Sequence, residues 1–319
     1  IGKTTFLAYL IKNKLDNEKS KARYFILNHK HELVTGNSSS FNYQYYIYND
    51  IKYIFLDTPG LIQYSKTLNK TLLSCNVDLI LYCEKEINDR LKELYYEYAK
   101  YNQIPFVCIY LHSKISKLPY LNMKDPIKQD KIMTWLESKI NKDNDTSSIL
   151  NEETEFILLK TYPHQDLGWI LSGFLRKGKI KINQDMTWYE KSNIKVSVKS
   201  IHVNNVSVKE ITSPIIATIC LDEMKEHEIK PKYGFLSSKY YPKNNPIFNM
   251  KIGIKWIWKK GDLPYILHGC IDNNQITFEY DIEEQNYYLV NTNINFNIFN
   301  KIFISLFEDF MGLGMVFNL

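Results

Sequence analysis

The stretch IGKTTFLAYLIKNK (residues 1–14) decides the fold of this chain. A glycine, a lysine and a threonine at the start of an amphipathic helix form the end of a phosphate-binding loop, G-x-x-x-x-G-K-[ST], whose backbone amides surround phosphates. In that loop the lysine neutralises phosphate charge and the hydroxyl holds magnesium, so Gly2, Lys3 and Thr4 are candidate phosphate and metal ligands. The first glycine of the loop would precede Ile1, and we therefore expect the chain to be truncated at its N-terminus. Alone, the motif also fits an ordinary helix start.

A second informative stretch is YIFLDTPG (53–60), an apolar strand that ends in Asp57 and is followed by Gly60. P-loop proteins use such an aspartate on the magnesium side and such a glycine N–H for the γ-phosphate. Alone, D-T-P-G is also typical of a turn after a strand. Because G-K-T-T lies upstream, we expect the first helix and the loop that ends at Gly60 to converge on one metal-bound triphosphate.

Bulk composition sets wider limits. The 319 residues exceed the ~250 that one core usually supports, so we expect two or three domains, and the 45% hydrophobic content indicates a folded protein. The net charge of +5 is spread along the chain, which allows an RNA partner but also fits a solvated lysine-rich surface. Five scattered cysteines without C-x-x-C argue against disulfides and zinc and favour a reducing, cytoplasmic location. No apolar run reaches the ~18 residues of a membrane helix, so no membrane partner is expected.

The first half of the chain alternates strand-like and helix-like stretches. This pattern predicts an α/β P-loop G domain over 1–150, with a mostly parallel sheet and helices on both faces. Asn49-Asp50 predicts a tight hairpin turn. The expected strands are 22–27, 43–49, 51–58, 77–84 and 106–112, and the expected helices are 61–76, 87–101 and 127–141.

The character of the sequence changes after the polar stretch KDNDTSSILNEE (142–153), which we interpret as a linker. Beyond it short alternating strands recur and no convincing helix is found. A second polar break, YYPKNNP (240–246), divides these strands into two sets. We therefore predict two small antiparallel β-barrels, over 151–242 and 243–319.

A resemblance to a known family becomes specific in HKHELVTGNSSSFNYQYYIYN (29–49). This stretch resembles the switch I segment of the GTP-binding protein 1 and 2 branch of translational GTPases, relatives of elongation factor Tu and elongation factor 1-alpha. That segment reads K-H-E-(x)2-(S/T)-G-(x)-T-S-S, and Ser38 falls where the family carries the threonine that closes on magnesium. A serine-rich surface loop is the alternative. The residues that match as they stand are His31, Glu32, Gly36, Ser39 and Ser40.

Three later stretches, 154–173, 198–211 and 301–319, are similar to segments of the second and third domains of the same family, in the same order. The resemblance implies a G domain followed by two barrels, with GTP/GDP and Mg2+ as ligands. It also implies an RNA partner such as tRNA, mRNA or the ribosome, and we expect a monomer.

Two departures from the family pattern bear on activity. Leu61 stands where these GTPases carry the histidine that orients the attacking water, and Gln63 is a weak substitute. In the guanine-reading N/T-K-x-D element the chain has Ser113-Lys114-Ile115-Ser116, so Lys114 can pack across the base but Ser116 replaces the aspartate. Loss of such a charge-assisted contact costs about 1.5 to 3 kcal/mol per hydrogen bond. We therefore expect weakened hydrolysis and weakened guanine selectivity.

The sequence thus predicts a divergent translational GTPase that binds Mg-GTP. One alternative is a non-hydrolysing nucleotide sensor, or an RNA- or protein-binding module with a degenerate G domain. Another, an unrelated P-loop ATPase, is disfavoured by the two barrels. The candidate residues are Gly2, Lys3, Thr4, Thr5, Asp57, Gly60, Ser113 and Lys114 for the nucleotide, Thr4, Ser38 and Asp57 for the metal, and Gln63 for catalysis.

Overall fold

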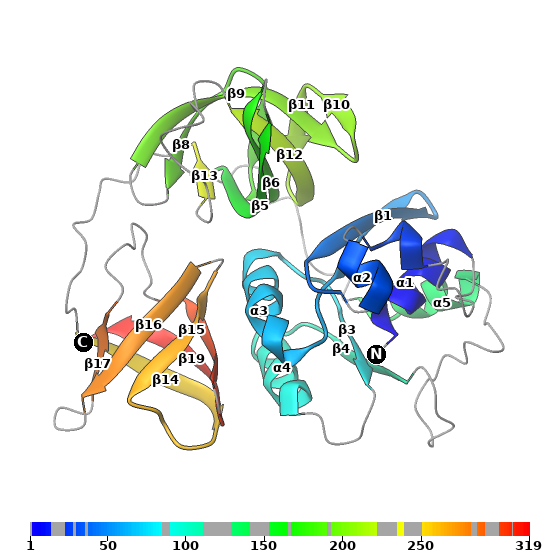
Figure 1. The fold of residues 1–319 in the computed structure, drawn as a ribbon. Coiled ribbons are helices and arrows are strands. Elements are labelled where there is room, and N and C mark those ends of the chain that lie inside the picture. Colours follow the sequence, from blue (N-terminus) through cyan, green and yellow to red (C-terminus); the bar gives the residue numbers. More distant parts are fainter. Residues whose placement is uncertain are drawn as a thin grey trace. The chain divides into compact units, whose positions relative to one another are not determined.

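The chain divides into two compact units, and most of their helices and strands are labelled in Figure 1. The first unit contains Ile1–Leu68 and Val77–Asn144, and the second contains Asn69–Asn76 and Asp145–Leu319. The computed structural model describes residues 2–13, 23–27, 30–35, 38–84, 90–110, 129–140, 153–164, 167–189, 193–221, 235–238, 251–272, 274–281, 286–290, 300–307 and 309–319.

Helices and strands alternate before residue 140, which confirms the predicted α/β class. The helices are α1 (Lys3–Lys12), α2 (Lys30–Thr35), α3 (Ser65–Ser74), α4 (Arg90–Tyr101) and α5 (Gln129–Glu137), with short 3₁₀ helices η1 (Arg23–Phe25) and η2 (Ile62–Tyr64). The strands are β1 (Asn42–Tyr48), β2 (Ile51–Asp57), β3 (Ile80–Glu84) and β4 (Phe106–Tyr110). None of the helices in the described ranges is long and apolar enough to cross a bilayer.

The strands of the first unit pair in two ways. β1 and β2 form an antiparallel hairpin in which Asn42 pairs with Asp57, and β3 and β4 are parallel. The hairpin turn is Asn49 and Asp50, with φ of 48° and 60°. A two-residue turn of this kind requires positive φ at both positions, and asparagine and aspartate tolerate it. The predicted tight turn is confirmed, and it brings the end of β2 level with the start of β1.

The apolar face of α1 packs into the core of the first unit. Phe6, Tyr9 and Leu10, at helical spacing, are buried together with Ile109 of β4 and Met133 of α5. Burial of one such side chain contributes about 1.5 to 3 kcal/mol. This packing holds the amino end of α1 in a fixed place in the first unit.

The predicted strand over 22–27 is wrong. Residues 23–25 form the 3₁₀ helix η1, in which Tyr24 and Phe25 are exposed, whereas the following Ile26 and Leu27 are buried. Two exposed side chains followed by two buried ones do not have the period of two that a half-buried strand needs. The aromatic and β-branched composition suggested a strand, but the local backbone turns instead.

The second unit is built from strands, and its first barrel closes on itself. The described strands of this barrel follow the order β9-β12-β6-β5-β13-β8, and β8 pairs back with β9. The bounds are β5 (Glu155–His164), β6 (Gly168–Lys177), β8 (Asp185–Tyr189), β9 (Asn193–Val203), β12 (Ile215–Leu221) and β13 (Phe235–Ser237). The short strands β7 (Lys179–Lys181), β10 (Val206–Val208) and β11 (Glu210–Thr212) form smaller pairings.

The second barrel is also closed and antiparallel. Its described strands follow the order β14-β17-β16-β15-β18-β19, and β19 pairs with β14. The two predicted antiparallel barrels are therefore confirmed. The bounds are β14 (Lys251–Lys260), β15 (Ile266–Ile271), β16 (Asn274–Asp281), β17 (Asn286–Leu289), β18 (Ile302–Phe307) and β19 (Phe310–Asn318).

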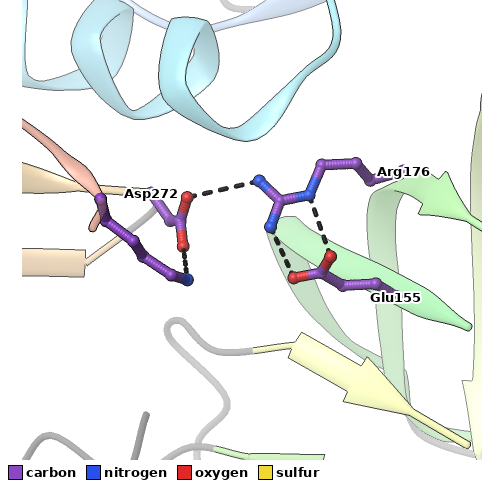
Figure 2. A network of polar contacts seen from close by, with 4 residues as sticks. Glu155, Arg176 and Asp272 are labelled. Carbon is purple, nitrogen blue, oxygen red and sulfur yellow. Dashed lines mark hydrogen bonds and ion pairs between the residues drawn. The ribbon is translucent and has the colours of Figure 1, made fainter. Parts of the chain in front are cut away.

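A network of ion pairs lies within the second unit (Figure 2). Arg176 of β6 donates two hydrogen bonds to Glu155 of β5, of 3.1 Å from Nε and 2.5 Å from Nη2. Its Nη1 donates a third, of 3.3 Å, to Asp272, which follows β15 and also accepts from Lys301. The guanidinium therefore joins a strand pair of the first barrel to a turn of the second.

Candidate functional site

The amino end of α1 presents backbone donors. Gly2 is the N-cap residue, with φ of 93°, and no side chain caps the helix there. Glycine adopts such a positive φ without steric cost because it has no Cβ, which explains this residue at this position. The first turn of α1 carries no acidic residue. Because the first N–H groups of a helix have no partner within the helix, such an end suits an anion, phosphate in particular.

Three oxygen-bearing side chains meet just inside this helix end. The Thr4 hydroxyl donates a hydrogen bond of 2.8 Å to Oδ2 of Asp57, at the end of β2. The Ser38 hydroxyl lies 2.8 Å from Thr4 Oγ1 and 3.4 Å from the same Asp57 oxygen. Thr4 and Ser38 are each 6% exposed and Asp57 is 4% exposed. Residues from α1, the end of β2 and the segment before β1 thus form one buried polar cluster, which we call the Asp57 cluster.

The carboxylate of Asp57 is buried, and burial disfavours an unpaired negative charge. Burial raises the pKa of Asp57, whereas the Lys3 charge and the hydrogen bonds from Thr4 and Ser38 oppose the rise. The negative charge of Glu32 adds to the increase. A buried carboxylate of this kind is stabilised by additional positive charge, so the cluster favours a cation.

Lys3 lies beside the loop that follows β2. A Cβ added to Gly60 would fall on the Lys3 ammonium group, so glycine leaves room for that group at position 60. Lys3 is half-buried, and its charge acts on Asp57. The first helix and the loop that ends at Gly60 therefore come together in the structure.

The donor set suits a small hard cation. Mg2+ prefers oxygen ligands, usually one or two carboxylates with other oxygens. The Asp57 cluster offers one carboxylate and two hydroxyl oxygens, close to a helix end that suits phosphate. The residues present therefore fit a magnesium ion that is bound together with phosphate groups.

A further polar contact was not predicted from the sequence. Glu32 of α2 is fully buried, and its Oε1 accepts hydrogen bonds from the backbone N–H groups of Ser39 and Ser40, of 2.7 and 3.1 Å. The hydroxyls of both serines donate to the same oxygen, over 2.9 and 3.3 Å. Helix α2 was also missed, because six residues are too few for a helical period to show. The pattern around Glu32 matched the family segment, but the match alone assigned the residue no role.

The remaining candidates lie apart from the cluster or outside the described residues. Leu61 is 43% exposed, and Gln63 lies on the exposed surface of η2 and takes no part in the described hydrogen bonds of the Asp57 cluster. Thr5 is half-buried on α1. Outside the described residues are Gly36, Ser113, Lys114 and Ser116, and with them the base-reading element.

Comparisons with solved structures give the fold. The bacterial selenocysteine-specific elongation factor EF-Sec has a TM-score of 0.71 at 14% identity, over 98% of this chain and 56% of that one. Elongation factor SelB from Methanococcus maripaludis, in complex with the GTP analogue GppNHp, has a TM-score of 0.66 at 13% identity, over 88% and 74%. The S. cerevisiae Ski7 GTPase-like domain, bound to GTP, has a TM-score of 0.70 at 14% identity, over 99% and 94%. The chain spans about half the length of EF-Sec.

The sequence comparison identifies the family. No curated protein matches the sequence. The profile of the family described as "Elongation factor Tu GTP binding domain" matches residues 1–225, well over half of the chain. This match confirms that the chain is related to elongation factor Tu. The chain belongs to the elongation factor Tu GTP-binding domain family.

Proposed function

We propose that this chain binds a guanine nucleotide with Mg2+ at the Asp57 cluster and acts as a translational GTPase-type switch beside RNA or ribosomes. The observation that carries the proposal is the convergence of Thr4, Ser38 and Asp57, from three separate segments, at the amino end of α1. A buried carboxylate, two hydroxyls and a lysine at a helix end are the groups that P-loop proteins use for Mg-triphosphate.

On the phosphate side of the proposed site, one set of residues binds the phosphates and another binds the metal. Lys3 and the first N–H groups of α1 would hold the phosphate oxygens, and the Gly60 N–H would meet the γ-phosphate. Thr4, Ser38 and Asp57 would hold the metal, which supplies charge neutralisation on the phosphate oxygens when it is bound.

The roles that we propose at the base side of the site are based on the sequence alone. Ser113 and Lys114 would contact the guanine base, and Ser116 in place of the family's aspartate weakens the preference for guanine over adenine. One lost charge-assisted hydrogen bond corresponds to roughly a ten- to hundredfold loss of affinity.

Hydrolysis is weakened in this proposal. Leu61 has no group that can orient water, and the exposed Gln63 on η2 is a weak substitute. Phosphoryl transfer depends on placement and electrostatics, so the loss of a water-orienting group slows turnover more than binding.

The proposed partners follow from the family and the similar structures. The Ski7 domain is solved with GTP and with GDP and inorganic phosphate, and SelB and EF-Sec are named as elongation factors. We extend this to GTP and GDP as the ligands of our chain, and to tRNA, mRNA or the ribosome as its surroundings. The proposal includes a monomeric chain in the cytoplasm, where its five free cysteines would stay reduced.

A second candidate is a non-hydrolysing nucleotide sensor whose barrels carry the interaction with RNA or protein. The exposed apolar Leu61 next to Gly60 favours this candidate. Both candidates bind the nucleotide, but only the first hydrolyses it.

The test is a titration with labelled GTP, GDP and ATP, followed by single-turnover hydrolysis with and without ribosomes. The protein is used with any residues that precede Ile1 included. Mg-dependent GTP binding with slow, ribosome-stimulated turnover supports the switch. Tight binding without turnover selects the sensor, and no binding of any nucleotide overturns both.

A further inference from the structure

We propose that Glu32 is a positioning residue that holds the segment 38–41, called here the Ser38 loop, over the phosphate side of the Asp57 cluster and thereby sets a preference for triphosphate over diphosphate. This inference rests on the proposed function. It assigns a role to a residue that contacts neither metal nor nucleotide in that proposal.

The first support is the chemistry of the contact. A single carboxylate oxygen of Glu32 accepts two backbone N–H groups and two hydroxyls, all from Ser39 and Ser40. Successive backbone N–H groups that point at one anion form a concave anion-binding nest. Hydrogen bonds to a charged acceptor are roughly twice as strong as neutral ones. The Ser38 loop therefore closes around a carboxylate supplied by the protein itself.

The second support is what the contact fixes. Ser38 directly precedes the two serines held by Glu32, and its hydroxyl lies against Thr4 and Asp57. At the other end of the loop, Phe41 is buried and β1 begins at Asn42, which pairs with Asp57. The loop is thus held at both ends, and Glu32 holds the two residues that directly follow Ser38.

The third support is the electrostatic cost of placing an acid there. Glu32 is fully buried, and its charge acts unfavourably on Asp57. A second buried carboxylate beside the first disfavours the folded protein unless it is compensated. The four hydrogen bonds that Glu32 accepts from the Ser38 loop contribute to that compensation. Loss of Glu32 should therefore release the loop that would close on the γ-phosphate, while the diphosphate contacts at α1 remain.

The experiment compares Glu32→Ala and Glu32→Gln with the unaltered chain. Affinities for a non-hydrolysable GTP analogue and for GDP are measured in the presence of Mg2+. We expect Glu32→Ala to weaken binding of the triphosphate at least ~10-fold, or about 1.4 kcal/mol, and to change GDP binding less than ~2-fold. Glu32→Gln should restore most of the affinity, because an amide oxygen accepts the same hydrogen bonds. Equal losses for both nucleotides, or no loss for either, would overturn the proposal.

Two controls separate positioning from general damage. Val34→Ala changes a residue of the same helix that is 87% exposed, and Glu137→Gln changes an acid outside the cluster that accepts the Tyr53 hydroxyl at 2.6 Å. Neither should alter the ratio of the two affinities. If Glu32→Ala does not fold, the double change Ser39→Ala and Ser40→Ala removes the two hydroxyl donors and should shift the ratio in the same direction.

Amide hydrogen exchange of the nucleotide-free protein separates this inference from the proposed function. Glu32→Ala should speed exchange at the Ser39 and Ser40 amides, and Val34→Ala should leave it unchanged. Unchanged exchange in Glu32→Ala would show that Glu32 does not hold the loop, whatever the nucleotide results. If the unaltered chain binds neither nucleotide but exchange speeds up, the proposed function and the triphosphate preference both fail, and only the tie between Glu32 and the loop stands.

Discussion

The Thr4 hydroxyl donates a 2.8 Å hydrogen bond to the carboxylate of Asp57, although 53 positions separate the two residues in the sequence. The bond joins the first turn of α1 to the end of β2, and both residues are buried. A threonine that follows G-K and an aspartate in D-x-x-G are thus one physical unit.

Asp57→Asn should stabilise the nucleotide-free protein. Burial raises the pKa of Asp57 above its ordinary value of 3.8. Because the pKa of Asp57 is higher in the folded state, its neutral carboxyl contributes to stability below pH 3.8. That contribution is lost as the pH rises through the folded-state pKa. The uncharged variant should therefore exceed the parent in free energy of unfolding by on the order of 1 kcal/mol near neutral pH.

Scanning calorimetry over a pH series measures this difference. The advantage of Asp57→Asn should shrink as the pH falls toward the ordinary pKa, because the parent carboxyl then becomes neutral. A variant that is less stable than its parent at neutral pH would show that favourable contacts of the carboxylate outweigh its burial.

Leu61→His should speed hydrolysis of bound GTP. The family the chain resembles carries a histidine there, and a group that orients water at this point should accelerate single-turnover hydrolysis by roughly tenfold or more. GTP affinity should stay within about twofold, because water orientation matters in the transition state. The control is Ile62→His, which changes the neighbouring residue, itself 62% exposed. Equal rates for both variants would contradict the role given to position 61.

Asp272→Ala should destabilise the second unit. Asp272 and Arg176 are each 17% exposed in their side chains, so removal of the acid leaves a largely buried guanidinium with fewer partners. The expected loss in free energy of unfolding is about 2 to 3 kcal/mol. The control is Lys181→Ala, at an exposed pair with Glu210, where the change should stay within about 0.5 kcal/mol.

Urea unfolding followed by tryptophan fluorescence reports on this unit. Four of the five tryptophans lie in barrel strands, namely Trp169, Trp188, Trp256 and Trp258. Equal midpoints for Asp272→Ala and Lys181→Ala would show that the network contributes no more than a surface pair does.

Cys75 and Cys83 should react slowly in the native protein. Burial raises the pKa of Cys75 to about 12 and that of Cys83 to about 11, from 9.0. Because the thiolate is the nucleophile, alkylation near pH 8 should be at least ~100-fold slower than in urea. The raised pKa values also mean that stability declines as the pH rises from about 9 toward 12. Mass spectrometry of alkylated peptides measures the rates, and native rates close to those in urea would refute the burial of these thiols.

The parts of the fold that sequence could predict are those with strong local chemistry. Asn49-Asp50 needed no tertiary information, because the two-residue turn demands residues that tolerate positive φ. Alternating side chains likewise predicted most barrel strands. The strand β8 (Asp185–Tyr189) lacks this alternation, because its last four residues are all buried. The 3₁₀ helix η1 was mistaken for a strand for a related reason, since its composition was strand-like and its burial was not.

The candidate site divides in the same way. Lys3, Thr4, Asp57 and Gly60 belong to short motifs whose spacing has a mechanical reason, and the structure brings these residues together. The role of Glu32 depends on hydrogen bonds to a loop seven and eight positions later, and such bonds are visible only once the chain is folded.

Binding of Mg-GTP at the Asp57 cluster is tested by a titration of Thr4→Val and of the parent chain with labelled GTP, in the presence of Mg2+ and of a chelator. Valine keeps the shape of this buried residue and removes its hydroxyl. We expect Mg-dependent GTP binding by the parent and an affinity at least ~10-fold weaker, or about 1.4 kcal/mol, in Thr4→Val. GTP affinity that changes neither with the chelator nor in Thr4→Val would contradict the proposed Mg-GTP site. No GTP binding by the parent would contradict it as well.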